Sequence, residues 1–393
     1  MSDKKLSLSR ENDSNLLLTE VISDRIQAKS NRLITFAEFM ELALYHPQYG
    51  YYTTKAVDIG AQGDFFTSPH LGKDFGELLA VQFVQMWEVL GKPAAFTLVE
   101  MGAGQGILAV DIFKYLYKHY REFFEALQYI IIEVSPGLKQ QQQQLLQGVA
   151  NKVKWCSLEE IPALSITGCI FSNELVDAMP VNLFSLQDGQ LGEIYVTLCE
   201  NNTFTEVCSA PSTPKIAQYF DLVGINLAQL AGNYRSEINL AAIDWLSTIS
   251  QKLQQGYLLT IDYGYAAARY YNPMRSQGTL QCYYRHQYHN NPYINIGEQD
   301  ITAHVDFTAL ERWGEKCGLQ KVGFTQQGLF LMALGLGERI AAISTDCANN
   351  LEQLLQRRET LHQLIDPQGL GGFGVLVQSK GLPLSISLKG LMA

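Results

Sequence analysis

The sequence predicts a doubly wound α/β fold, in which helices cover both faces of a mostly parallel, Rossmann-like sheet of seven strands. From residue 95 onward, short apolar runs rich in β-branched residues alternate with segments long enough to form helices. The first run leads directly into three alternate glycines, as strands of such sheets do where a ligand binds. A chain of 393 residues, 47% of them apolar, can bury the core that this fold needs.

The individual elements follow from the spacing of apolar residues. The predicted strands are Phe96–Met101, Tyr129–Val134, Val153–Cys156, Ile170–Ser172, Tyr257–Ile261, Gln320–Thr325 and Gly374–Gln378. Helices are predicted over Ile107–His119 and Gly137–Gln147, and the run Gln140–Gln144 in the second is interpreted as a solvated face. Thr35 and Glu38 have capping-box spacing, which predicts a further helix that Pro47 ends.

Composition and pattern divide the chain into five parts. They are a polar tail over 1–30, an N-terminal helical segment over 31–94, the first half of the core over 95–180, an inserted α+β subdomain over 181–255, and the second half of the core over 256–385. The insertion is predicted from three alternating runs separated by turn residues and followed by a helical part over 215–253. These runs are Asn182–Leu186, Glu193–Cys199 and Thr203–Cys208.

The charge and cysteine content argue against several classes of function, although a local basic patch stays possible. The 39 acidic and 29 basic residues give a net charge of −10, which argues against broad attraction to nucleic-acid backbones or anionic lipid. The seven cysteines form no C-x-x-C pair, and His286 and His289 lack further ligands, so no metal site is predicted. The first thirty residues contain five acidic side chains and no apolar signal core, and we expect a cytoplasmic enzyme without a membrane span.

The glycine loop after the first strand predicts the cofactor. Gly102, Ala103, Gly104 and Gly106 form G-x-G-x-G, the spacing common in methyltransferases, whereas a dinucleotide fingerprint would need glycine in place of Ile107. S-adenosyl-L-methionine is therefore favoured over a nicotinamide cofactor, and a tight turn without a ligand is the alternative.

Acidic residues near the loop extend the predicted cofactor site. Glu100 is placed to meet the ammonium group of the cofactor, and Glu133, after the next strand, is placed to accept both ribose hydroxyls. Leu158, after the third strand, is the position where the adenine ring is expected.

The ends of the fourth and fifth strands predict the site of methyl transfer. Asn173, Glu174 and Asp177 follow the fourth strand, and Asp262 ends the fifth at the same edge of the sheet. A carboxylate pair can hold an arginine guanidinium bidentately, and Glu174 and Asp177 are our candidates. The alternative is that these acids only stabilise a helix N-terminus. His304 is predicted either to line the substrate pocket or to be structural.

Taken together, the motifs resemble the MidA-like methyltransferases, the family that includes the mitochondrial complex I assembly-factor arginine methyltransferase. The resemblance spans roughly residues 33–380. It is carried by the segments Tyr45–Tyr52, Gly63–Pro69, Phe75–Glu77, Glu100–Gly106, Glu133–Pro136, Asn173–Pro180, Asp262–Gly264, Gly278–Leu280 and Asp300–Phe307.

The resemblance implies a class I methyltransferase sheet and a function. By resemblance, the N-terminal helical segment covers the cofactor, with Gly63, Asp64, Thr67 and Ser68 folded over it. It also implies that Asn173 and Glu174 face the methyl-transfer site. The implied activity is ω-N methylation of arginine in the hydrogenase-like subunit of a complex I-like NADH dehydrogenase complex, during assembly.

Two positions depart from the family pattern, and other functions stay open. His70 stands where an acidic residue is expected, and Ala103 replaces a frequent proline. One alternative is methylation of a small molecule, with the insertion as a lid. Another is an assembly chaperone that binds S-adenosyl-L-methionine without transferring its methyl group. The oligomeric state stays open, a homodimer included.

Overall fold

A computed structural model describes residues 13–54, 67–230, 232–346, 351–383 and 387–392. Its central sheet has seven strands in the order β16-β17-β10-β5-β2-β3-β4. Their bounds are β2 Phe96–Met101, β3 Leu127–Ile132, β4 Val153–Trp155, β5 Ile166–Asn173, β10 Leu253–Asp262, β16 Gln320–Gln326 and β17 Gly374–Lys380. The five strands from β10 to β4 are parallel, and β17 runs antiparallel to both of its neighbours. The predicted doubly wound α/β fold is confirmed.

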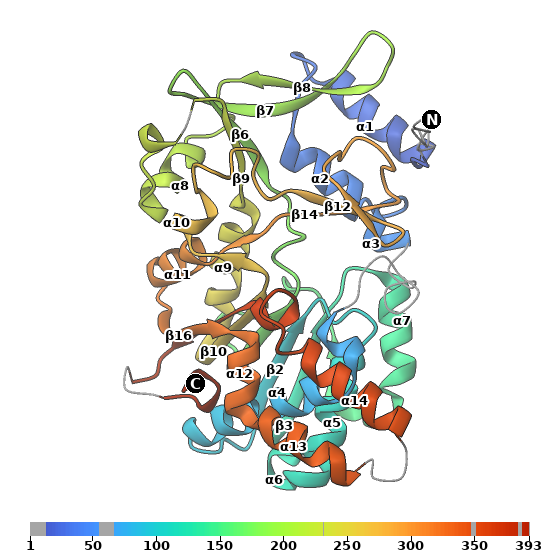
Figure 1. The fold of residues 1–393 in the computed structure, drawn as a ribbon, viewed down its shortest axis with the longest axis vertical. Coiled ribbons are helices and arrows are strands. Elements are labelled where there is room, and N and C mark those ends of the chain that lie inside the picture. The colour runs from blue at the N-terminus through green and yellow to red at the C-terminus, as the bar shows by residue number, and fades with distance from the viewer. Residues whose placement is uncertain (1–12, 55–66, 231, 347–350, 384–386, 393) are drawn as a thin grey trace, which may run out of the picture.

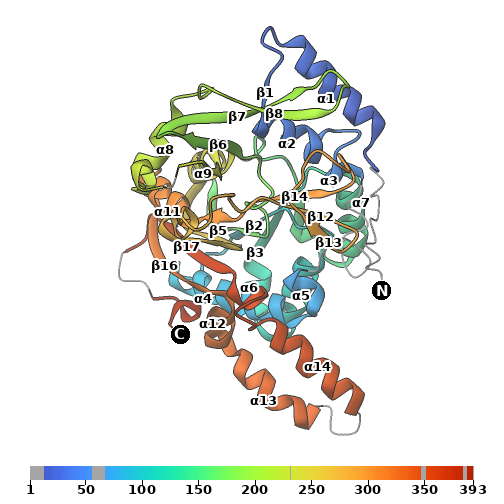
Figure 2. The same cartoon turned by 45° about the horizontal axis from the view of Figure 1, so that its top comes forward.

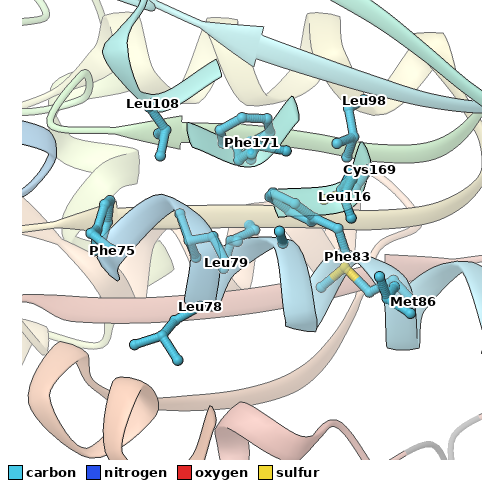
Figure 3. Close-up of a cluster of buried hydrophobic side chains, with 14 of the residues drawn as sticks. Phe75, Leu78, Leu79, Phe83, Met86, Leu98, Leu108, Leu116, Cys169 and Phe171 are labelled. Carbon is cyan, nitrogen blue, oxygen red and sulfur yellow. The ribbon is translucent and has the colours of Figure 1, made fainter. Parts of the chain in front are cut away.

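Side chains alternate between the two faces of a strand, and those of β2 and β5 are mostly buried on both faces. Helices therefore cover both faces of this sheet. The helices α4 (Asp74–Val89) and α5 (Ile107–His119) pack on one face, and α9 (Leu240–Lys252) and α11 (Phe307–Lys316) pack on the other. In Figure 3, Phe83 of α4 lies beside Phe171 of β5, and their ring centroids are 5.0 Å apart. Burial of each such aromatic side chain contributes about 1.5–3 kcal/mol.

A second sheet lies beyond the carboxyl ends of the central strands, above them in Figure 1. Its strands are β1 (Ile34–Thr35), β6 (Asn182–Gln187), β7 (Gln190–Leu198), β8 (Phe204–Ser209) and β9 (Tyr234–Ile238). The helix α8 (Lys215–Val223) packs on it, as does α2 (Phe36–Tyr45). The Thr35 hydroxyl accepts the Glu38 N–H at 3.1 Å, so the predicted N-cap of α2 is confirmed.

The structure moves two of the predicted boundaries. The expected polar tail over 1–30 contains the 13-residue helix α1 (Leu16–Ala28), which buries Leu18, Ile22 and Ile26 against α2 and the second sheet. The helical part expected over 215–253 contains the strand β9, and its last helix, α9, packs on the central sheet instead. The inserted body therefore ends near residue 238. It is completed by β12 (Gln281–Tyr284), β13 (Gln287–His289) and β14 (Asp300–Thr302).

The remaining α-helices and short strands lie in the loops between the elements already described. They are α3 (Tyr51–Thr54), α6 (Arg121–Ala126), α7 (Pro136–Leu145), α10 (Ala267–Tyr270), α12 (Gln327–Leu331), α13 (Gly337–Asp346) and α14 (Leu351–Gln363), with β11 (Gly264–Tyr265) and β15 (Val305–Asp306). Figure 2 shows α13 and α14 projecting away from the rest of the chain. Within the described ranges, every helix is too short or too polar to cross a bilayer.

Candidate functional site

A cavity of about 920 Å³ lies at the carboxyl edge of the central sheet. Its walls come from loops after β2, β3, β5 and β10, and from α2, α3, β12 and β14 of the second body. Such an edge is where open α/β sheets bind their ligands. The cavity is therefore the place to test the predicted cofactor and acceptor residues.

The glycine loop forms one wall of the cavity. Gly102, Gly104 and Gly106 have φ angles of 72°, 52° and 81°, in the left-handed region that favours glycine. A Cβ atom on Gly104 would meet nothing within 4 Å, while one on Gly102 would lie 2.9 Å from the Leu175 side chain. Gly102, Ala103 and Gly104 line the cavity, and Gly106 is the N-cap of α5. The loop thus leaves room for a ligand to approach the backbone closely.

Glu100 faces the same cavity from the carboxyl end of β2, where it is the penultimate residue. Its carboxyl group is 3% exposed and accepts a hydrogen bond of 2.7 Å from the Tyr129 hydroxyl. Burial raises the pKa of Glu100 to about 7. A cationic ammonium group in the cavity would stabilise the ionised form, which fits the predicted role of Glu100.

Glu133 is held in place by a residue that the sequence analysis interpreted as solvated. The buried Gln142 side chain donates from Nε2 to Glu133 Oε2 at 3.0 Å and to the Gly104 carbonyl at 2.7 Å. Its Oε1 accepts from Trp155 Nε1 at 2.9 Å. The solvated interpretation is wrong for Gln142, because α7 turns this one member of the glutamine run onto the glycine loop. Gln142 therefore holds the glycine loop and Glu133, the predicted partner of the ribose hydroxyls, in place relative to each other.

Of the other predicted cofactor residues, only Thr67 is described in the wall of the cavity. Thr67 lines the cavity, and its hydroxyl lies 2.7 Å from His70 Nδ1. Ser68 is buried behind the wall, where Gln327 Nε2 donates to its hydroxyl at 3.0 Å. Leu158 packs against the core on the far side of the sheet from α4 and is absent from the cavity wall. Gly63 and Asp64 lie outside the described residues.

Asn173, Glu174 and Asp177 lie together in the cavity wall, on the side where the sequence analysis predicted the methyl acceptor. We call this part of the wall the acceptor side. Glu174 adopts a φ of 52°, unusual for a residue with a side chain, and its Oε1 accepts from Asn173 Nδ2 at 3.0 Å. Burial and the neighbouring Asp177 raise the pKa of Glu174 to about 8, and burial raises that of Asp177 to about 6. Asn173 Oδ1 and Asp177 Oδ1 are buried and accept no hydrogen bond from any described residue.

Asp262 does not line the cavity, although the sequence placed it at the same edge. It is fully buried, and its Oδ2 accepts the backbone N–H groups of Leu175, Val176 and Asp177 at 3.2, 2.9 and 3.3 Å. Burial, then Asp177 and Glu174, raise the pKa of Asp262. Asp262 therefore supports the backbone of residues 175–177 and does not face the cavity.

His304 lies in an aromatic wall of the cavity. Its ring stacks on Tyr265 with centroids 5.1 Å apart and meets Tyr263 edge-on at 5.0 Å. Burial lowers the pKa of His304 to about 4, so the ring is neutral at neutral pH. Its Nδ1 is buried without a described partner. The sequence left open whether His304 lines the substrate pocket or is structural, and its place in the cavity wall favours the pocket.

Several residues of the acceptor side were missed by sequence reasoning. Asp300 is buried and accepts a hydrogen bond of 2.9 Å from the Tyr52 hydroxyl, 248 positions away. Tyr45 stacks on Tyr52, and its hydroxyl donates to the Ala178 carbonyl at 2.9 Å. Asp300 and Tyr52 stood inside the resembling motifs, but no local pattern predicts that they meet. In the described residues, no group of three or more His, Cys, Asp or Glu side chains could hold a metal ion.

Comparisons with known proteins agree with this geometry. Residues 78–325 match the family described as "Putative S-adenosyl-L-methionine-dependent methyltransferase". A Drosophila melanogaster protein named protein arginine methyltransferase NDUFAF7 homolog, mitochondrial, is 28% identical over 382 residues, covering 89% of this chain and 82% of that protein. The Rattus norvegicus protein arginine methyltransferase NDUFAF7 is also 28% identical, over 87% of this chain and 80% of its own length.

Solved structures extend the comparison to the fold. The crystal structure of a Burkholderia thailandensis protein bound to S-adenosyl-homocysteine has a TM-score of 0.83 and 29% identity, covering 96% of this chain and 94% of that one. A native crystal structure from the same organism has a TM-score of 0.82 and 30% identity, with the same coverage. The glycine loop, the carboxylates at the cavity and these similarities lead to one conclusion: the chain belongs to the MidA-like family of S-adenosyl-L-methionine-dependent methyltransferases.

Proposed function

We propose that this methyltransferase methylates the guanidinium group of an arginine side chain in a protein partner. The observation that carries the proposal is the pair of buried acceptor atoms, Asn173 Oδ1 and Asp177 Oδ1, that have no donor in the described structure. A buried acceptor without a donor costs about 1–3 kcal/mol, so the site is built to receive a ligand with N–H groups. A guanidinium carries five N–H donors and no acceptor.

The charge of the cavity supports a cationic acceptor. Five carboxyl groups line it, whereas Arg269 is the one lysine or arginine among the described lining residues. The five are Glu100, Glu133, Glu174, Asp177 and Asp300. A cation would offset the repulsion among the three carboxyl groups on the acceptor side, Glu174, Asp177 and Asp300, which an anionic or neutral metabolite could not do.

The residues of the chain have separate tasks in the proposed reaction. Bound S-adenosyl-L-methionine would supply a methyl group on a positively charged sulfur. A nucleophile can take this methyl group, and the sulfur then leaves as a neutral thioether. Glu174 and Asp177 hold the guanidinium and localise electron density on the attacking nitrogen. That nitrogen loses a proton as it gains the methyl group, and Glu174, whose pKa is raised to about 8, is suited to receive it. The neutral His304 can accept an N–H from the same substrate.

The identity of the partner rests on the motifs and on the names of relatives. Proteins of flies and rats that resemble this chain are named protein arginine methyltransferases. We therefore propose a protein substrate, and the motif resemblance favours the hydrogenase-like subunit of an NADH dehydrogenase-like complex. The cytoplasmic location stays a prediction, which fractionation of cells that express the tagged protein would test.

Methylation of that subunit by the purified enzyme tests the proposal. The subunit is incubated with isotopically labelled S-adenosyl-L-methionine, and the modified residue is located by mass spectrometry. Label on an arginine nitrogen is the expected result. Glu174→Gln should lower kcat by about 10²–10³-fold, because it removes the group that holds the guanidinium and receives its proton. Asp244→Asn is the matched control, since Asp244 is an exposed acid whose ion pair among the described residues is with Lys215.

Two outcomes would replace the proposal by the other readings. Label in a metabolite extract, with none in the subunit, would favour a small-molecule acceptor. Normal assembly of the complex with the Glu174→Gln protein, with no label on any subunit, would favour a chaperone that only binds the cofactor.

A further inference from the structure

One cationic side chain interrupts the acidic lining of the cavity. Arg269, in α10, lines the cavity and is exposed, whereas Asp177 is 6% exposed. Arg269 therefore lies at the mouth and Asp177 lies deep in the cavity. In a chain with a net charge of −10, a single arginine at the mouth of an acidic cavity is a distinct feature of the site.

An aromatic wall connects the two positions. Asp177 and Tyr263 both line the cavity, and their side chains hydrogen-bond. The Tyr263 ring meets His304 at 5.0 Å, His304 stacks on Tyr265 at 5.1 Å, and the Arg269 guanidinium lies 4.2 Å from the Tyr265 ring centroid. The wall offers a flat apolar surface along which the stem of a long side chain can pack.

The guanidinium of Arg269 keeps its hydrogen-bonding capacity for a ligand. Among the described residues, it contacts the Tyr265 ring and acts on His304 through its charge, but it donates no hydrogen bond. Its neighbour Arg275 contacts the same ring at 4.5 Å but donates from Nη1 to the carbonyls of Arg269 and Tyr270 at 2.9 and 3.3 Å. Arg275 thus stabilises the local backbone, while the donors of Arg269 stay open to solvent at the mouth.

We infer that Arg269 selects an acidic side chain next to the arginine that is methylated. The substrate segment would place its cation deep in the cavity, against the carboxyl groups, and a carboxylate at the mouth, against Arg269. An arginine fork binds a carboxylate bidentately, which gives orientation as well as affinity. Arg269 is then a specificity-determining residue that does not touch the reacting atoms. The inference rests on the proposed arginine methylation.

Two peptides that differ only in charge test the inference. Acetyl-Gly-Glu-Arg-Glu-Gly-amide and acetyl-Gly-Gln-Arg-Gln-Gly-amide are compared as substrates of the full-length enzyme at saturating S-adenosyl-L-methionine. With the native enzyme we expect the acidic peptide to have a KM about five- to tenfold lower and a similar kcat. The preference should shrink as salt is raised, because the pair at the mouth is exposed.

Variants of Arg269 separate selection from structure. Arg269→Gln should remove the preference by raising KM for the acidic peptide to that for the glutamine peptide, and Arg269→Lys should restore part of it. Arg358→Gln, at an exposed arginine of α14 away from the cavity, should keep the native preference.

The outcomes distinguish this inference from the proposed function. Equal KM values for the two peptides would overturn the role of Arg269 and leave arginine methylation standing. A preference that persists in Arg269→Gln would also overturn it. If the native enzyme neither binds nor methylates either peptide, a short arginine segment is not the acceptor. The inference would then fail, and labelling of the subunit would decide separately whether arginine methylation stands.

Discussion

Replacing Gln142 by leucine tests whether the glycine loop and Glu133 act as one unit. Leucine has a similar volume but cannot hydrogen-bond, so the change removes the bonds to Gly104, Glu133 and Trp155 at 2.7, 3.0 and 2.9 Å. A hydrogen bond contributes about 1 kcal/mol, and one to a carboxylate about 1.5–3 kcal/mol. We expect the loss at Glu133 to weaken binding of S-adenosyl-homocysteine by about tenfold, which corresponds to about 1.4 kcal/mol.

Calorimetric titration with S-adenosyl-homocysteine measures this change directly. Gln143→Leu is the matched control, since Gln143 is the next residue of α7 and is exposed. A double-mutant cycle with Glu133→Gln shows whether Gln142 affects cofactor binding through Glu133. If Gln142 acts through Glu133, the two losses should be less than additive in the double variant. Thermal unfolding of each variant shows whether the fold has been weakened as well.

The reasoning would be refuted by a specific result. A Gln142→Leu protein that binds S-adenosyl-homocysteine within twofold of the native Kd, with an unchanged melting temperature, would show that the three bonds do not position the site. Fully additive losses with Glu133→Gln would show that Gln142 acts independently of the carboxylate.

Three further predictions concern titration, the loop and the support of a helix pair. Since the folded-state pKa of Glu174 is raised to about 8, the folded state binds more protons than the unfolded state between about pH 4.5 and 8. The free energy of unfolding should therefore fall as the pH rises across that window, and it should fall less in Glu174→Gln. Denaturant titrations of both proteins at pH 5 and pH 8 measure this, and an equal change in the two proteins would contradict it. Gly104→Ala meets no clash but must hold a φ of 52°, so we expect a loss of about 1–2 kcal/mol in urea unfolding, and no loss would mean that the loop adopts another conformation. Asp74 is buried and pairs with Arg339 at 2.8 Å and Arg357 at 2.6 Å, so Asp74→Asn should cost about 2–3 kcal/mol in chemical denaturation, and an unchanged midpoint would show that the pairs are screened by solvent.

Much of the core could be predicted from the sequence because its signals are local. The strand β2 has its predicted bounds, and the three loop glycines have the positive φ angles that their pattern requires. Both features depend on residues only a few positions apart. The strand β3 begins two residues before its predicted start, since Leu127 and Gln128 pair with β2 although only one of them is apolar.

The acceptor side could be predicted only in part. Asn173, Glu174 and Asp177 reach the cavity as expected because parallel strands end at one edge of a sheet. Asp262 ends its strand at the same edge, yet its carboxyl group turns inward to accept three backbone N–H groups. The sequence places an acid at the edge, but the direction of its side chain depends on which donors surround it.

By itself, the sequence determined the parallel sheet, the glycine loop and the carboxylates that make the site acidic. Only the tertiary structure decided which members of equivalent sets take part. Five consecutive glutamines look alike in the sequence, and only the packing of α7 on the glycine loop buries Gln142 among them. Asp300 meets Tyr52 across 248 positions because the second body folds over the sheet edge. Periodicity specifies local structure, whereas contacts between distant segments follow from how the finished elements pack.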